Sequence, residues 1–281
     1  MTRQLLACER AEHRNENVNA LRLHFLHLER RGAPTVCFLH GGAAHAHWFD
    51  RVIPALGEGF DMIALDQRGH GESQWSMPPA YATEDFAGDL RALFDRLGWA
   101  RVILVGHSMG GHNAMAFAAW YPERTAGLVI VDSRPYLPPD RVQRMRERGR
   151  RPPRTHASED AAVAAFRLLP SDTIADPTLL AHMARMGLTR VDGGVRFRFD
   201  PACYADRRPV DCWPLLPRIA APTLIVRGEH SPVLPTDMAA RMRQTIANAE
   251  LVEIPGAYHH LTLDAPEVFG AALDAFLRRV L

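Results

Sequence analysis

Six short apolar runs, closed by polar or turn-forming residues, constrain the fold of this 281-residue chain more than any other feature. They occupy residues 35–39, 62–65, 101–105, 128–131, 223–226 and 251–254. Runs this short that are apolar on both faces are typical of central strands in a parallel sheet. Upstream, Leu21, Leu23 and Phe25 alternate as they would on one face of a further strand.

Segments of helical length separate the runs. Residues 84–97, 235–247 and 266–280 place apolar side chains at near-helical spacing. Regular alternation of strand and helix predicts an α/β fold, with a mostly parallel, doubly wound sheet that helices cover on both faces. In such sheets the functional loops lie beyond the carboxyl ends of the strands.

One stretch, residues 135–212, breaks this alternation. It is rich in Pro and Arg, and it shows helical patterning over residues 158–169 and 177–187. The stretch follows the carboxyl end of a predicted strand, so it would lie over the active face. We therefore expect a core domain of residues 1–134 and 213–281, with residues 135–212 inserted as a helical cap.

The strongest chemical signal is a G-x-S-x-G motif at residues 106–110, directly after a strand run and before a helical apolar pattern. This context is the one that a nucleophile elbow requires. A Ser on such a tight turn needs neighbours without side chains, which explains Gly106 and Gly110. We expect Ser108 to be the nucleophile.

Four motifs together resemble the α/β-hydrolase fold superfamily over nearly the full chain. They are His40-Gly41-Gly42, the segment 66–73 (DQRGHGES), the elbow at 106–111, and residues 255–259 (PGAYH). The resemblance implies an eight-stranded, mostly parallel sheet with an inserted cap. The family has Gly where this chain has Tyr258, and we expect that change to alter the pocket wall.

The resemblance also implies a catalytic triad. In the family, the base stands at fixed distances in sequence from two prolines. Counting from Pro255 and Pro266 gives His259, rather than the adjacent His260, as the base. The usual acid position, in the turn after the run at 223–226, holds Ser231. A known variation moves the acid to the end of the preceding strand, where this chain has Asp132. Asp132 is thus the expected acid.

Glu229, one turn position from the usual slot, is the alternative acid. An oxyanion hole needs two backbone donors. We expect the N–H of Met109, directly after the nucleophile, and the N–H of Gly42, or less favourably of Ala43. Further residues are expected to line the substrate pocket: His40, Ala43, Trp48, His107, Tyr258 and His260.

The composition of the chain excludes several classes of function. The chain has 33 Arg and no Lys, which excludes Schiff-base chemistry, a pyridoxal anchor and a P-loop. A net charge of +1 argues against nucleic acid as a partner. No segment approaches the roughly 20 apolar residues of a membrane span, so we expect no membrane and a cytoplasmic location.

No cofactor is expected, because neither a phosphate cradle nor a flavin fingerprint is present. No metal is expected either, because the four Cys form no C-x-x-C pair and His45 and His47 lack further clustered ligands.

The predicted cap is basic. Residues 139–208 hold 14 Arg against nine Asp or Glu. Such a lid could steer an anionic small-molecule substrate. A solvated basic face in an Arg-rich chain is the alternative, and composition favours it. The sequence leaves a homodimer open.

Together these features predict a serine hydrolase that cleaves a carboxylic ester or lactone through Ser108, His259 and Asp132. A C–C bond hydrolase of ring-cleavage products and a cofactor-free dioxygenase share the fold and remain alternatives. A non-enzymatic ligand receptor is disfavoured because the triad set is intact. Epoxide hydrolysis and dehalogenation are disfavoured because the elbow holds Ser rather than Asp.

Overall fold

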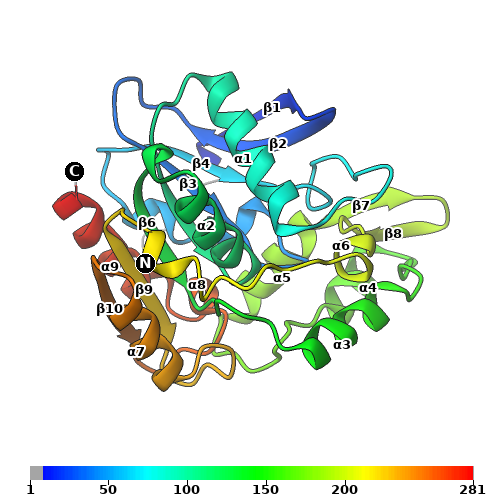
Figure 1. The fold of residues 1–281 in the computed structure, drawn as a ribbon. Coiled ribbons are helices and arrows are strands. Elements are labelled where there is room, and N and C mark those ends of the chain that lie inside the picture. The colour runs from blue at the N-terminus through cyan, green and yellow to red at the C-terminus, as the bar shows by residue number, and fades with distance from the viewer. Residues whose placement is uncertain (1–8, 281) are drawn as a thin grey trace, which may run out of the picture.

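An eight-stranded sheet forms the centre of the molecule (Figure 1). The computed structural model describes residues 9–280. The strands are β1 (Glu12–Val18), β2 (Leu21–Leu28), β3 (Thr35–Leu39), β4 (Asp61–Leu65), β5 (Val102–His107), β6 (Thr125–Val131), β9 (Thr223–Gly228) and β10 (Ala249–Ile254).

The strand order is β1-β2-β4-β3-β5-β6-β9-β10. The first hairpin, β1 and β2, pairs antiparallel, and β2 joins β4 antiparallel. Every pairing from β4 to β10 is parallel. The predicted mostly parallel α/β sheet is confirmed, and the six apolar runs form its parallel part.

Helices cover both faces of the sheet. On one face lie α1 (Thr83–Leu97), α2 (Met109–Trp120) and α7 (Thr236–Thr245). On the other lie the short helices η2 (Ala46–Phe49) and η3 (Ile53–Ala55), with α9 (Pro266–Val280). Three further short helices are η4 (Pro122–Arg124), η5 (Leu216–Arg218) and α8 (Leu261–Asp264).

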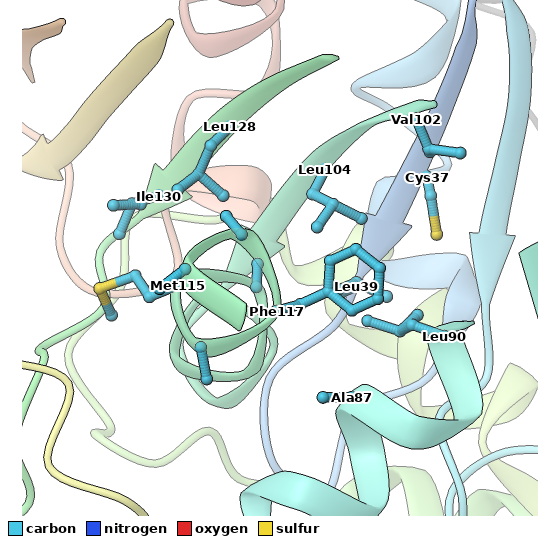
Figure 2. Close-up of a cluster of buried hydrophobic side chains, with 14 of the residues drawn as sticks. Cys37, Leu39, Ala87, Leu90, Val102, Leu104, Met115, Phe117, Leu128 and Ile130 are labelled. Atoms are coloured by element: carbon cyan, nitrogen blue, oxygen red, sulfur yellow. The ribbon is translucent and has the colours of Figure 1, made fainter. Parts of the chain in front are cut away.

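The core divides along the strands because their side chains alternate between the two faces. In β5, Leu104 packs towards α1 and α2, and Val105 packs towards η2 and α9. Figure 2 shows Phe117 of α2 directed at the strand residues Leu104 and Leu39. This central, fully buried packing fixes the carboxyl ends of β5 and β6, where the candidate site lies.

The segment between β6 and β9 contains α3 (Pro139–Gly149), α4 (Glu159–Ala165), α5 (Pro177–Met186), β7 (Leu188–Val191), β8 (Gly194–Phe197) and α6 (Ala202–Ala205). In Figure 1 α3, α4, α6 and the β7–β8 hairpin gather on one side of the sheet. We expected this segment to be helical, but it also contains a hairpin, in which β7 and β8 pair antiparallel.

The missed hairpin carries a weak apolar pattern, since only Leu188 and Val195 of its strands are buried. Its turn, Asp192-Gly193, is a typical hairpin dipeptide and is the signal that could have revealed it. The division into core and cap at residues 135 and 212 stays a prediction. Within residues 9–280, none of the helices combines the length and apolar character that crossing a bilayer requires.

Candidate active site

Ser108 lies at a sharp turn between β5 and α2. Its backbone has φ +53°, a conformation that side-chain-bearing residues rarely adopt. Tight packing of main chain against main chain holds the turn. A Cβ atom on Gly110 would lie 2.2 Å from the carbonyl oxygen of Leu39, and one on Gly106 would lie 2.5 Å from that of Gly110. Glycine at these two positions therefore allows the strained turn that presents Ser108 to the cavity.

His259 lies in the loop after β10 and links two side chains. Its Nε2 is 3.1 Å from Ser108 Oγ, and its Nδ1 is 3.0 Å from Asp132 Oδ1. An ionised carboxylate only accepts hydrogen bonds, so Nδ1 carries the proton and donates to Asp132. Nε2 of the neutral ring is then the acceptor for the Ser108 hydroxyl. The geometry is that of a nucleophile held by its base.

Asp132 follows β6 and has the positive backbone φ of +44°. Its Oδ2 accepts a hydrogen bond from the N–H of Gly228 at 2.9 Å, and its Oδ1 accepts one from Ser231 Oγ at 2.6 Å. The carboxylate is fully buried. Three donors thus compensate the desolvation of one negative charge.

Glu229, the alternative acid, points elsewhere. Its side chain is exposed, and its carboxylate accepts a hydrogen bond from the N–H of Gly256 at 2.8 Å. Asp132 occupies the position next to His259 Nδ1. Ser231, which stands in the slot where the family usually has its acid, contacts Asp132 rather than the imidazole.

Burial dominates the electrostatics of the pair. Burial and, to a smaller extent, the guanidinium groups of Arg141 and Arg134 together lower the pKa of His259 to about 3. Burial raises the pKa of Asp132 to about 6, although the bonds from Ser231 and Gly228 act in the opposite direction. At neutral pH the imidazole is therefore neutral and able to accept a proton, and the carboxylate is ionised.

The two expected oxyanion donors lie at the cavity wall with Ser108. Gly42 and Met109 both line the cavity. Met109 is the first residue of α2, so helical geometry gives its N–H no partner within the helix. Ala43, the less favoured donor, has φ +58° in the same loop.

Tyr204 of α6 covers the loop at Gly42. A Cβ on Gly42 would lie 3.0 Å from Tyr204 Oη. Burial raises the pKa of the Tyr204 hydroxyl to about 12, so it stays protonated at neutral pH. The sequence analysis missed this residue, because nothing in the local pattern of α6 indicates that it reaches the β3 loop.

The other expected pocket residues lie outside the cavity wall. His40 is buried, where its Nε2 accepts a hydrogen bond from the N–H of Gln67, so it braces the loop instead. Trp48 stacks on His107, with ring centroids 6.2 Å apart. Tyr258 packs against the ring of His230. None of these three side chains is among the residues that line the cavity.

His107 and His260 surround the base. His107 Nε2 donates to the carbonyl oxygen of His259 at 2.9 Å. His260 Nε2 donates to the carbonyl oxygen of Pro170 at 3.0 Å, which joins the base loop to the segment between β6 and β9. Both rings therefore fix the position of the loop that carries His259.

A cavity of about 370 Å³ opens over Ser108 and His259. Its other walls come largely from residues that the sequence analysis did not assign: His112, Ser133, Arg134, Leu137, Arg141, Arg144, Met145, Arg148, Leu169, Pro170, Tyr204, Arg207 and Val233. Most lie between β6 and β9. Their position depends on how that segment folds back over the sheet, and local sequence patterns do not encode it.

Three His-containing groups in the described part of the chain have the atom spacing that could hold a metal ion. The first, His107, His259 and His260, lies at the site, the second, His47, Asp50 and His182, lies beside η2, and the third comprises His13, His24 and Glu72. In the first group, His259 is already hydrogen-bonded to Ser108 and Asp132. In the second, His47 and His182 both bond to Asp50 Oδ2, at 3.1 and 2.9 Å. His45, the other histidine of the H-x-H sequence, bonds through Nε2 to the carbonyl oxygen of Met183.

Comparison with known proteins agrees with this geometry. The chain matches the model of the alpha/beta hydrolase fold family over residues 34–266, and it belongs to that family. It is 29% identical over 256 residues to a 2-(acetamidomethylene)succinate hydrolase from Mesorhizobium japonicum, covering 89% of this chain and 90% of the relative.

Two further similarities bear on the reaction. A 2-hydroxy-6-oxononadienedioate/2-hydroxy-6-oxononatrienedioate hydrolase from Paraburkholderia xenovorans is 29% identical, with 88% of each chain covered. The crystal structure of the enol-lactonase from Burkholderia xenovorans LB400 superposes with a TM-score of 0.78 at 25% identity, covering 94% of this chain and all of that one. All three of these proteins are named as hydrolytic enzymes.

Proposed function

We propose that this protein is a serine hydrolase that cleaves a carboxylic ester or lactone through an acyl-enzyme on Ser108. One observation carries the proposal: His259 lies within hydrogen-bond distance of both Ser108 Oγ and Asp132 Oδ1. A nucleophile, a base and an orienting acid in one chain are the requirements for acyl transfer.

In the first half-reaction, Ser108 Oγ bonds to the carbonyl carbon while its proton passes to His259 Nε2. The carbonyl oxygen becomes an oxyanion, which accepts hydrogen bonds from the N–H groups of Met109 and Gly42. Asp132 stabilises the imidazolium. The tetrahedral intermediate collapses as the C–O bond to the leaving group breaks, and the leaving oxygen takes the proton from His259.

In the second half-reaction, water attacks the acyl carbon as His259 takes one of its protons. Collapse breaks the bond to Ser108 Oγ, which recovers its proton, and the carboxylic acid leaves. With a lactone, the alcohol formed in the first half stays attached to the acyl chain. The similarity to an enol-lactonase structure supports ester-type chemistry.

C–C bond hydrolysis is a second candidate. The similarity to a hydrolase of 2-hydroxy-6-oxo dienedioates favours it. Such a substrate has a ketone at which the same serine, base and oxyanion donors could act. The two candidates differ in the bond that breaks, so turnover of matched substrates separates them.

The test is a panel of short p-nitrophenyl esters, small lactones and 2-hydroxy-6-oxo dienoates with purified protein. We expect ester or lactone turnover that the Ser108→Ala substitution lowers by about 10³-fold or more. Turnover of the dienoate alone would favour the C–C hydrolase. Ester turnover that persists in Ser108→Ala would contradict the mechanism, and oxygen consumption with substrate would favour the dioxygenase alternative.

A further inference from the structure

The cavity over Ser108 is strongly basic. Five arginines line it: Arg134, Arg141, Arg144, Arg148 and Arg207. No Asp or Glu is among the described residues that line it. A concave site lined by charges of one sign concentrates the field at a ligand of the opposite sign. Some arginines of the basic segment that composition indicated therefore line the cavity, and others face the solvent.

Three of these arginines already have partners within the protein. Arg134 donates from its guanidinium to the carbonyl oxygen of Val233 at 3.0 Å. Arg207 is buried and donates from Nη2 to Asn113 Oδ1 at 2.9 Å. Arg144 forms an ion pair with Asp140 at 2.7 Å. Their guanidinium groups contribute charge, but each has a structural role.

Arg141 and Arg148 differ from these three. Within residues 9–280, neither guanidinium has an ion pair or a hydrogen bond to another side chain or carbonyl group. Arg141 is half-buried, and Arg148, which also lines the cavity, is exposed. Burying Arg141 partly without a partner is unfavourable unless a ligand supplies one.

Helical geometry puts both on one face. They are seven residues apart in α3, which is two turns and about 10 Å along the axis. Arg141 lies near enough to His259 to lower the pKa of the imidazole, and Arg148 lies near enough to Tyr204 to lower that of the phenol. The pair thus spans the wall from the base to the loop of Gly42.

We propose that the cavity takes a carboxylate-bearing ester or lactone, whose carboxylate is bound by Arg141 and Arg148. Guanidinium matches a carboxylate in geometry and charge, and the bonds are charge-assisted. The bound anion would offset the positive charge next to His259 and so favour the protonated imidazole that forms during acylation. The inference rests on the proposed function, because it names the substrate class of the same site.

The test compares p-nitrophenyl hemiglutarate with its methyl-capped diester in four proteins: wild type, Arg141→Gln, Arg148→Gln and the double variant. Arg150→Gln is the matched control, because it removes the same charge from an exposed position at the end of α3 outside the cavity wall. Circular dichroism and the thermal midpoint verify that each variant is folded.

For wild type we expect kcat/KM for the hemi-ester to exceed that for the diester by tenfold or more. Each single substitution should lower this ratio severalfold, and the double variant should abolish it, mainly through KM. Arg150→Gln should retain the ratio. An unchanged ratio in the folded double variant would overturn the proposal.

Binding to the Ser108→Ala variant tests the same site without turnover. Calorimetry should show that the hemi-amide of glutarate binds at least tenfold more tightly than its methyl ester, and the double variant should lose the difference. Ser108-dependent turnover without any preference for the carboxylate would overturn the carboxylate site and leave the hydrolase. A retained binding preference without any turnover would overturn the hydrolase and leave the carboxylate site.

Discussion

Ser231 Oγ donates a 2.6 Å hydrogen bond to Asp132 Oδ1, the same oxygen that accepts the hydrogen bond from His259 Nδ1. Asp132 at the end of β6 therefore lies where the acid of a triad would lie, and the turn after β9 supplies a hydroxyl that holds its carboxylate. Ser231 Oγ in turn accepts a hydrogen bond from the N–H of Val233 at 3.0 Å, which fixes the direction of its proton. The hydrogen bond between Ser231 and Asp132 joins the end of β6 to the turn after β9.

The choice of acid is testable by substitution. Asp132→Asn should lower kcat for a p-nitrophenyl ester by about 10³- to 10⁴-fold, because an amide at this position does not stabilise the imidazolium. Glu229→Gln should change kcat by less than about threefold, since its carboxylate contacts Gly256 at the surface. Steady-state kinetics of both variants identify the acid. A larger loss of kcat in Glu229→Gln than in Asp132→Asn would exclude Asp132.

Ser231 should position the acid. Ser231→Ala removes a hydrogen bond to a buried charge, so we expect kcat to fall about tenfold with KM little changed. In an Asp132→Asn background, Ser231→Asp should recover at least tenfold in kcat, because it places a carboxylate next to the imidazole from the other strand. A double variant that is no better than Asp132→Asn alone would show that the turn after β9 cannot supply the acid.

The acid side of the pH profile should follow Asp132. Burial raises the pKa of this carboxyl to about 6, so it gains a proton as the pH falls through that range. The reaction needs the ionised form, and kcat/KM for an uncharged ester should be constant from pH 8 to 7 and then fall below about pH 6. Initial rates from pH 4 to 8 measure this limb. A profile that stays flat to pH 4 would contradict the assignment.

Replacing a glycine of the elbow should destabilise the protein. Gly110→Ala places a Cβ 2.2 Å from the carbonyl oxygen of Leu39, and overpacking of this kind costs about 1–3 kcal/mol. Gly88→Ala is the control, because it lies within α1 with the nearest atom 3.9 Å away. That substitution should stabilise the protein by about 0.5–1 kcal/mol. Urea unfolding gives both values, and equal stability of the two variants would contradict the packing argument.

Much of the fold could be predicted because its signals are local. The apolar runs mark the central strands, and the helix predicted at 266–280 is α9 itself. The β7–β8 hairpin was missed because its strands are short and mostly half-exposed. A weak amphipathic pattern of four residues does not distinguish a strand from a loop.

In the candidate site, too, some residues could be predicted from local sequence and others could not. Ser108, Asp132 and His259 follow strand ends, so topology alone brings them to one edge of the sheet, and their hydrogen bonds agree with the expected geometry. Their catalytic roles stay predictions. The cavity wall could not be predicted, because Tyr204 and Arg141 come to line the cavity over Ser108 only through the folding of the segment between β6 and β9.

The central claim is that Ser108 forms a covalent acyl-enzyme, and trapping with a fluorophosphonate probe tests it most directly. Intact-mass spectrometry should show one phosphonyl group per chain, peptide mapping should place it on Ser108, and ester turnover should fall in proportion to labelling. Ser108→Ala should remain unlabelled. Full ester turnover in a protein that the probe does not modify, or labelling that persists in Ser108→Ala, would contradict the account.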